Sequence, residues 1–120
     1  MKRDMDLVRK ILLAVEELPP TIVQPRTLSI PDASDPIVNE HVHLLDEAGL
    51  IEAIDASTRG SAAWIPMRLT WEGHEFLESM RNESVWNKAK SELASRGLGF
   101  SFDLMKAALL TAAKHLLSAA

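Results

Sequence analysis

The segment Arg68–Arg81 reads RLTWEGHEFLESMR and marks a change from strand to helix. Before Thr70, apolar residues occupy every second position, which is the period of a β-strand; they are Ile65, Met67 and Leu69. After Thr70, apolar residues recur at the three- and four-residue spacing of an amphipathic helix. Thr70 is a favourable N-cap, and Glu72 lies in the first turn, where the helix dipole favours a carboxylate. We therefore predict a strand that leads directly into a helix capped by Thr70.

Upstream of this segment, the sequence predicts two helices separated by a proline-rich stretch. Asp4 can cap the first helix, which ends at the prolines in positions 19 and 20. The second helix begins near residues 34 and 35, either of which can cap it, and ends at Gly49, the usual glycine position after a helix. Between the two helices, Thr27–Ile30 alternates in hydrophobicity. We predict a short strand there.

Residues 50–69 predict a β-hairpin. The sequence Thr58–Ser61 has the composition of a hairpin tip, and Ala62–Leu69 forms the return strand. Pro66 lies inside this strand, so it fits only an edge position or a bulge.

Two further helices are predicted after a break near Asn82. The first ends at Gly97, and Ser101 can cap the second. Apolar residues of the last helix step by alternating threes and fours, which is typical of a helix that pairs with another helix in its own chain or in a second subunit; they are Phe102, Met105, Leu109, Ala112 and Leu116.

The composition indicates a soluble protein and excludes several classes of site. A chain of 120 residues with 47% hydrophobic residues is sufficient for one folded domain. The net charge of -4 argues against a dedicated nucleic-acid binder, because phosphate neutralisation dominates that affinity. The absence of cysteine excludes disulfides and thiolate metal sites. No apolar run approaches the roughly 20 residues of a membrane helix, so we expect a cytoplasmic protein without membrane contact.

Three blocks of sequence carry a resemblance to a known family. They are MKRDMDLVRKIL at residues 1–12, HVHLLDEAGLIEA at residues 41–53 and LTWEGHEFLESMR at residues 69–81, with VWNKAK behind them. The chain resembles an uncharacterised family of short bacterial and phage-borne proteins, classed as a domain of unknown function. This resemblance implies a winged-helix-like fold and a phage or prophage origin, and it implies no activity.

LLDEAGLI and LTWEGHEFL are also similar to the recognition-helix end and the wing exit of winged helix-turn-helix domains. One departure is that the proline-rich loop Pro19–Pro31 replaces the helix that normally supports the recognition helix. We predict a mainly α fold with a small β-wing (α+β). Residues 1–81 form a winged-helix-like domain, and residues 82–120 form a C-terminal helical extension packed on it or on a second subunit.

A first candidate site is a nucleic-acid surface. The outward positions of the helix at 35–48 would include Asn39, Glu40 and His43, which could contact base edges. However, residues 27–58 contain seven acidic residues and neither lysine nor arginine, so we favour a solvated acidic face over base readout. Contacts to phosphate would then come from the wing and the amino terminus, through Lys2, Arg3, Arg59 and Arg68.

A second candidate is a surface for a protein partner or a second copy of the chain. Trp71, His74 and Glu78 share one face of their predicted helix. We favour the alternative that the carboxy-terminal helices cover Trp71, with Trp86 or Phe100 alongside. The predicted partner or dimer surface comprises Trp71, His74, Met105, Leu109 and Leu116.

No motif predicts catalysis, a cofactor or a metal site. His41 and His43 are two residues apart and lie on different sides of a helix, and WEGHEF lacks the two-histidine spacing of a zinc hydrolase. We therefore expect a small non-enzymatic accessory module that binds a protein partner or itself and uses no cofactor. The alternative is a DNA-binding transcriptional regulator that uses the wing and the amino-terminal cations.

Overall fold

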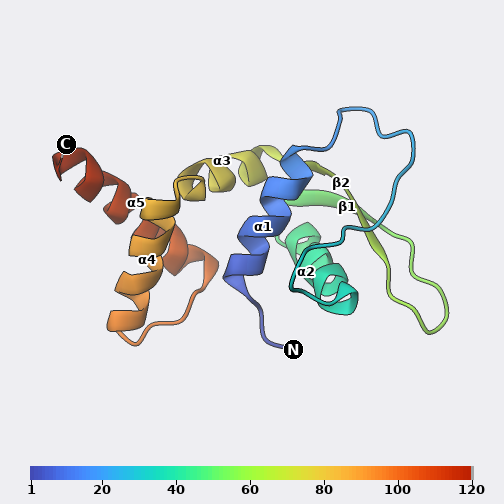
Figure 1. Cartoon of the computed structure of the whole chain (residues 1–120), viewed down its shortest axis with the longest axis horizontal. Coiled ribbons are helices and arrows are strands. Elements are labelled where there is room, and N and C mark those ends of the chain that lie inside the picture. The colour runs from blue at the N-terminus through green and yellow to red at the C-terminus, as the bar shows by residue number, and fades with distance from the viewer. Residues whose placement is uncertain (120) are drawn as a thin grey trace. The chain divides into compact units, whose positions relative to one another are not determined.

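The computed structural model describes residues 1–119 and the side chains of residues 1–117. Over this range the chain forms the helices and strands α1 (Met5–Glu16), α2 (Asp35–Glu47), β1 (Ile51–Asp55), β2 (Trp64–Leu69), α3 (Trp71–Met80), α4 (Glu83–Ser95) and α5 (Phe102–Ala119). The mainly helical α+β fold is therefore confirmed (Figure 1). The chain divides into two compact units, Met1–His74 and Glu75–Ala120, and the division falls inside α3.

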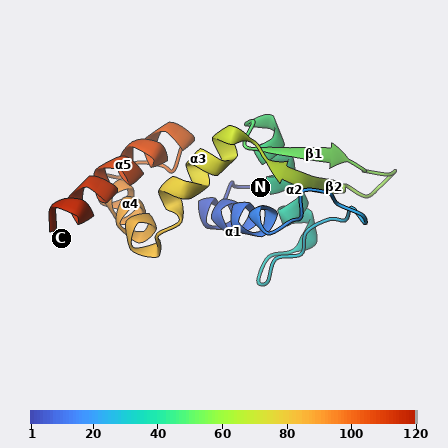
Figure 2. The same cartoon turned by 90° about the horizontal axis from the view of Figure 1, so that it is seen from above.

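In the first unit, α1 and α2 pack against each other and against the β1–β2 hairpin (Figure 2). The two helices form because each carries an apolar stripe at helical spacing. These stripes and a few residues of the hairpin are buried together in one core, which includes Ile11, Leu12, Val38, Val42, Ile51 and Leu69. The Asp4 carboxylate accepts hydrogen bonds from the N–H groups of Asp6 and Leu7, which confirms the predicted cap of α1.

The segment between α1 and α2 contains neither a helix nor a strand. The prediction of a strand at Thr27–Ile30 is therefore wrong. An alternating pattern forms a strand only where a neighbouring strand accepts and donates its backbone hydrogen bonds, and the two-stranded sheet pairs only β1 with β2. Ile30 alone of this stretch is buried.

The hairpin is antiparallel, and its register places Ile51 opposite Leu69 and Ala53 opposite Pro66. The register shifts between Glu52 and Ala53, so Pro66 lies beside a bulge, as its missing N–H led us to expect. At the tip, Thr58 and Ser61 exchange backbone hydrogen bonds of 2.9 and 3.0 Å, and Gly60 has a φ of 81°. The predicted turn is confirmed.

The start of α3 is held against the end of α2. The Thr70 hydroxyl accepts from the Gly73 N–H at 3.1 Å, which confirms the predicted cap, and it donates to the Gly49 carbonyl. The Thr70 N–H also donates to the Leu50 carbonyl at 3.0 Å. These bonds bring the Gly73 backbone directly against Leu50. The strand therefore leads into the helix at a position fixed by α2.

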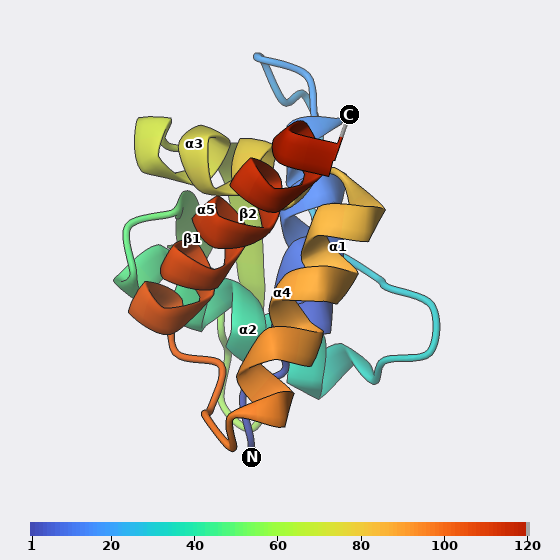
Figure 3. The same ribbon diagram turned by 90° about the vertical axis from the view of Figure 1, so that its left-hand side faces the viewer.

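In the second unit, α4 and α5 lie side by side (Figure 3). The side chains of Asn82 and Ser101 cap them by accepting from the N–H groups of Val85 and Leu104, and the cap at Ser101 confirms the prediction. The apolar face of α4 is buried, and the rings of Phe76 and Phe102 pack 4.6 Å apart. Met105, Leu109 and Ala112, which we call the inner seam of α5, are at most 2% exposed.

The inner seam therefore packs within its own chain. Because Met105 and Leu109 are enclosed there, they are not part of an accessible dimer surface, and their assignment to one is corrected. Their spacing correctly indicated helix pairing, but the spacing is the same for a helix of the same chain and for one of a second subunit.

Candidate interaction surfaces

The outward face of α2 differs from the prediction, because Asn39 is buried. Its amide donates to the Asp35 carbonyl at 2.9 Å, and its side-chain oxygen accepts from the Trp64 N–H at 2.8 Å. Asn39 therefore fastens β2 to α2 and cannot read a base.

His43 is also engaged within the first unit. Its ring stacks on Trp64 with 4.1 Å between centroids, and its nitrogens lie 3.7 and 3.1 Å from carboxylate oxygens of Glu40 and Glu47. A groove-binding helix would need cations at these positions. The exposed part of this face is instead acidic, as the sequence predicted.

His41 is a structural residue that the sequence-based interpretation missed. It is 0% exposed, and its Nε2 accepts from the Asp4 N–H at 2.9 Å. The Ile37 carbonyl lies 2.8 Å from Nδ1, so the imidazole is neutral with its proton on Nδ1. The available signal was its position on the stripe of Val38, Val42 and Leu45, which predicts burial for residue 41 as well.

The four predicted cationic contacts are all exposed, and Arg68 is paired with an acidic residue. The Arg68 guanidinium donates to both carboxylate oxygens of Glu52, at 2.9 and 2.7 Å, and to the Leu69 carbonyl. Arg59 lies at the hairpin tip, while Lys2 and Arg3 precede α1.

Near the tip, hydrogen bonds from the Ser57 side chain and backbone hold the pKa of Asp55 below its usual value. A carboxylate therefore lies near each end of the hairpin, Glu52 beside Arg68 and Asp55 near the tip.

We expect the purified protein to show no salt-sensitive binding to random-sequence duplex DNA. Glu52 neutralises Arg68, and the acidic face of α2 would repel phosphate. Fluorescence anisotropy at low ionic strength, followed by a salt titration, measures this directly. Binding that falls steeply with salt, and that weakens further in Arg59→Glu, would contradict the expectation and favour the DNA-binding regulator.

Trp71 is 77% exposed. The expectation that the carboxy-terminal helices cover it stays a prediction. His74, one turn later on α3, is also exposed. Helical spacing places Trp71 on the side opposite Phe76 and Leu77, which are buried. The two residues form a small exposed face that includes a single large apolar side chain.

The second unit exposes a more extensive apolar surface on α5. Leu110 is 60% exposed and Leu117 is 77% exposed, and both lie on the side of the helix opposite the inner seam. We call five exposed residues along the middle of this side the outer seam of α5; they are Asp103, Ala107, Leu110, Lys114 and Leu117. Leu116, predicted as part of a dimer surface, is 37% exposed and lies nearer the inner seam.

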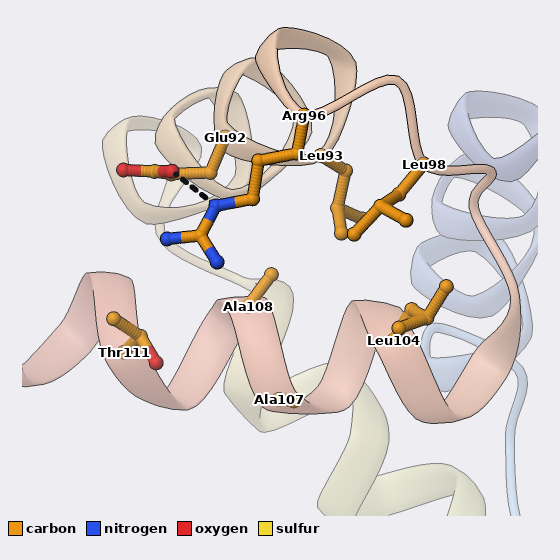
Figure 4. Close-up of a pocket in the computed structure, with 8 residues that line it drawn as sticks. All are labelled: Glu92, Leu93, Arg96, Leu98, Leu104, Ala107, Ala108 and Thr111. Atoms are coloured by element: carbon orange, nitrogen blue, oxygen red, sulfur yellow. Dashed lines mark ion pairs between the residues drawn. The ribbon is translucent and has the colours of Figure 1, made fainter.

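A shallow groove between α4 and α5 borders the outer seam (Figure 4). Leu93 and Leu98 line one side, and Leu104, Ala108 and Thr111 line the other. The ion pair between Arg96 and Glu92, with 3.5 Å between Nε and Oε2, lies at its rim. The groove volume of about 160 Å³ is below that of pockets that enclose small molecules.

Neither a membrane helix nor a metal cluster is found among the described residues. None of their helices has the length and hydropathy needed to cross a bilayer. In the same range, no group of three or more metal-ligating side chains is placed to hold an ion.

The sequence matches the model of a family described as "Hypothetical protein (DUF2513)" over residues 2–99. The chain belongs to the DUF2513 family. This confirms the predicted membership of an uncharacterised family. The DUF2513 match ends before α5 begins at Phe102.

One relative extends the similarity beyond that match. An uncharacterised protein of Haemophilus influenzae (strain Rd) is 38% identical over 122 residues, covering 98% of this DUF2513 chain and 100% of the relative. The similarity therefore includes α5. No solved structure matches the chain. The winged-helix assignment and the phage or prophage origin stay predictions.

Proposed function

We propose that the protein is a non-enzymatic interaction module that binds a protein partner through the outer seam of α5. The observation that carries this proposal is the exposure of Leu110 and Leu117 on a helix whose opposite side is already buried. This surface replaces Met105 and Leu109 as the binding surface, and it leaves Trp71 and His74 as a secondary contact.

Support comes from the distribution of apolar residues around α5. The helix contains only three residues that are charged at neutral pH, Asp103, Lys106 and Lys114, within residues 102–117. A helix with one packed side normally carries polar residues on the other side. The outer side of α5 carries these charged residues, but it also exposes Leu110 and Leu117, which are 60% and 77% exposed. With the inner seam covered within the chain, these two leucines are the apolar side chains left for a partner.

Support for a non-enzymatic role comes from the chemistry of the hollows. The groove beside α5 is small and apolar. A second hollow, under the proline-rich loop, has Arg26 as its one titratable lining residue. Acid–base catalysis requires positioned groups that can exchange protons, and arginine does not do so at neutral pH. A third hollow includes Asp46 and Glu52, but the Asp46 carboxylate accepts from the Ala53 N–H at 2.9 Å and Glu52 is paired with Arg68. We propose a cytoplasmic accessory protein that needs no cofactor.

The test is site-specific photo-crosslinking in the cells that naturally make the protein. A benzophenone amino acid at Leu110 should give a discrete crosslinked species, which mass spectrometry can identify. The matched control is the same amino acid at Val23, which is 88% exposed but lies in the first unit. Equal and diffuse labelling at both positions would contradict the proposed function.

A further inference from the structure

We propose that the occupant of the outer seam is a second copy of this chain, with the two α5 helices antiparallel. In this arrangement Ala107 faces Leu110 of the second copy, and Asp103 faces its Lys114. This inference rests on the proposed function and specifies the partner. The spacing, size and charge of the outer-seam residues each support it.

The spacing of the outer seam is that of a helix-pairing surface. Its five positions are separated by four, three, four and three residues, which is the a/d pattern of a coiled coil. Since an α-helix has about 3.6 residues per turn, these positions lie within one narrow stripe. All five side chains are exposed. The stripe is therefore accessible along most of α5.

The sizes of the central residues complement each other only when two helices run in opposite directions. Antiparallel pairing centred between residues 108 and 109 places Leu110 of each chain against Ala107 of the other. The small alanine leaves room for the leucine, as in knobs-into-holes packing. At the ends, Leu117 meets Phe100, a residue that is 38% exposed just before the α5 cap. A two-fold axis makes every contact occur twice.

The charges favour the same direction and register. Antiparallel pairing brings the exposed Asp103 carboxylate of each chain opposite the exposed Lys114 ammonium of the other. Parallel pairing would place Asp103 against Asp103 and Lys114 against Lys114, and like charges across a helix pair repel. A shift of seven residues in one direction would place Leu110 against Lys114. A shift of seven residues in the other direction would leave Asp103 and Lys114 unmatched. One arrangement therefore satisfies both the apolar and the charged positions.

The absence of cysteine allows a direct test of the arrangement, because each introduced thiol is the only one in its chain. Asp103→Cys and Lys114→Cys chains, mixed and oxidised, should form a disulfide between unlike chains. Each variant alone should not crosslink, because like positions are separated by eleven residues, or roughly 16 Å along the axis. A disulfide requires Cα atoms within about 7 Å. Crosslinking of each variant with itself would overturn the antiparallel register.

The strength of association is tested in the full chain by light scattering over a concentration series. The wild-type protein should be a dimer, and Leu110→Glu should raise the dimer Kd by at least about tenfold, because it places a carboxylate at the centre of the contact. Val23→Glu, an apolar-to-acid change at a more exposed position in the first unit, should leave Kd unchanged. Circular dichroism checks that each variant keeps its helices.

The outcomes separate this inference from the proposed function. A monomeric wild type whose residue 110 crosslinks to a different protein would overturn the second-copy inference and leave the interaction module intact. A monomer with no specific crosslink at residue 110 would overturn both. Dimerisation together with a disulfide only in the Asp103→Cys and Lys114→Cys mixture supports both.

Discussion

Gly73→Val should destabilise the first unit by more than about 3 kcal/mol, an effect typical of a side chain forced into occupied space. A Cβ atom at residue 73 would overlap the carbonyl oxygen of Leu50, which is a backbone atom and cannot rotate away. The Thr70 bonds to Gly49 and Leu50 hold the two segments together, so relief would require breaking them. Chemical denaturation followed by circular dichroism measures the loss, and Gly73→Ala should show most of it.

Gly99→Ala is the matched control for this substitution. Nothing lies within 4 Å of a Cβ atom built at Gly99, so its unfolding midpoint should stay close to that of the wild type. If Gly73→Ala and Gly99→Ala unfolded at the same denaturant concentration, the close approach of α3 to Leu50 would be wrong.

His41→Leu should reduce the free energy of unfolding by about 2–4 kcal/mol, since a part-buried N–H loses its acceptor and the core loses a close fit. The Asp4 N–H, which donates to His41 Nε2, would have no partner at the start of α1. His41→Gln should recover part of the loss, because its side-chain oxygen can reach the position of Nε2. Thermal or chemical denaturation of the variants gives the comparison.

His74→Leu is the control for an exposed histidine and should change stability by less than about 0.5 kcal/mol. The tautomer of His41 gives an independent check, because nitrogen NMR distinguishes a proton on Nδ1 from one on Nε2. A His41 side chain protonated on Nε2 in the folded protein would contradict the bond from Asp4.

The parts of the fold that the sequence predicted correctly depend on residues close together in the chain. Thr70 and Ser101 each cap a helix by accepting from an N–H three residues later. Such bonds follow from residue type and local spacing, so they are visible without knowledge of the tertiary structure. Gly49, with a φ of 75° after α2, belongs to the same class.

The parts that could not be predicted depend on distant partners. Asn39 was expected to face outward, but its hydrogen bond to Trp64 joins residues 25 positions apart. His41 bonds to Asp4 across 37 positions. Polar side chains at helical spacing look the same whether they meet solvent or a buried backbone group. Only the tertiary structure distinguishes these cases.

The same limit applies to α5, because spacing alone does not show which side of a helix is buried. The spacing indicated its inner seam, whereas the side that we propose for binding was not predicted. The outer seam contains Asp103 and Lys114 among its apolar residues, so a search for continuous apolar spacing overlooked it. Only the tertiary structure shows that the inner seam is buried and that the opposite side is exposed.

The bulge in the hairpin has a consequence for how this chain compares with its relatives. Pro66 pairs with Ala53 and Arg68 pairs with Glu52, so Met67 is a supernumerary residue of β2. A homologue lacking one residue at this point would keep every other cross-strand pair and would have an uninterrupted ladder. A single-residue gap at position 67 in an alignment would therefore record the evolutionary gain or loss of the bulge, with the rest of the hairpin unchanged.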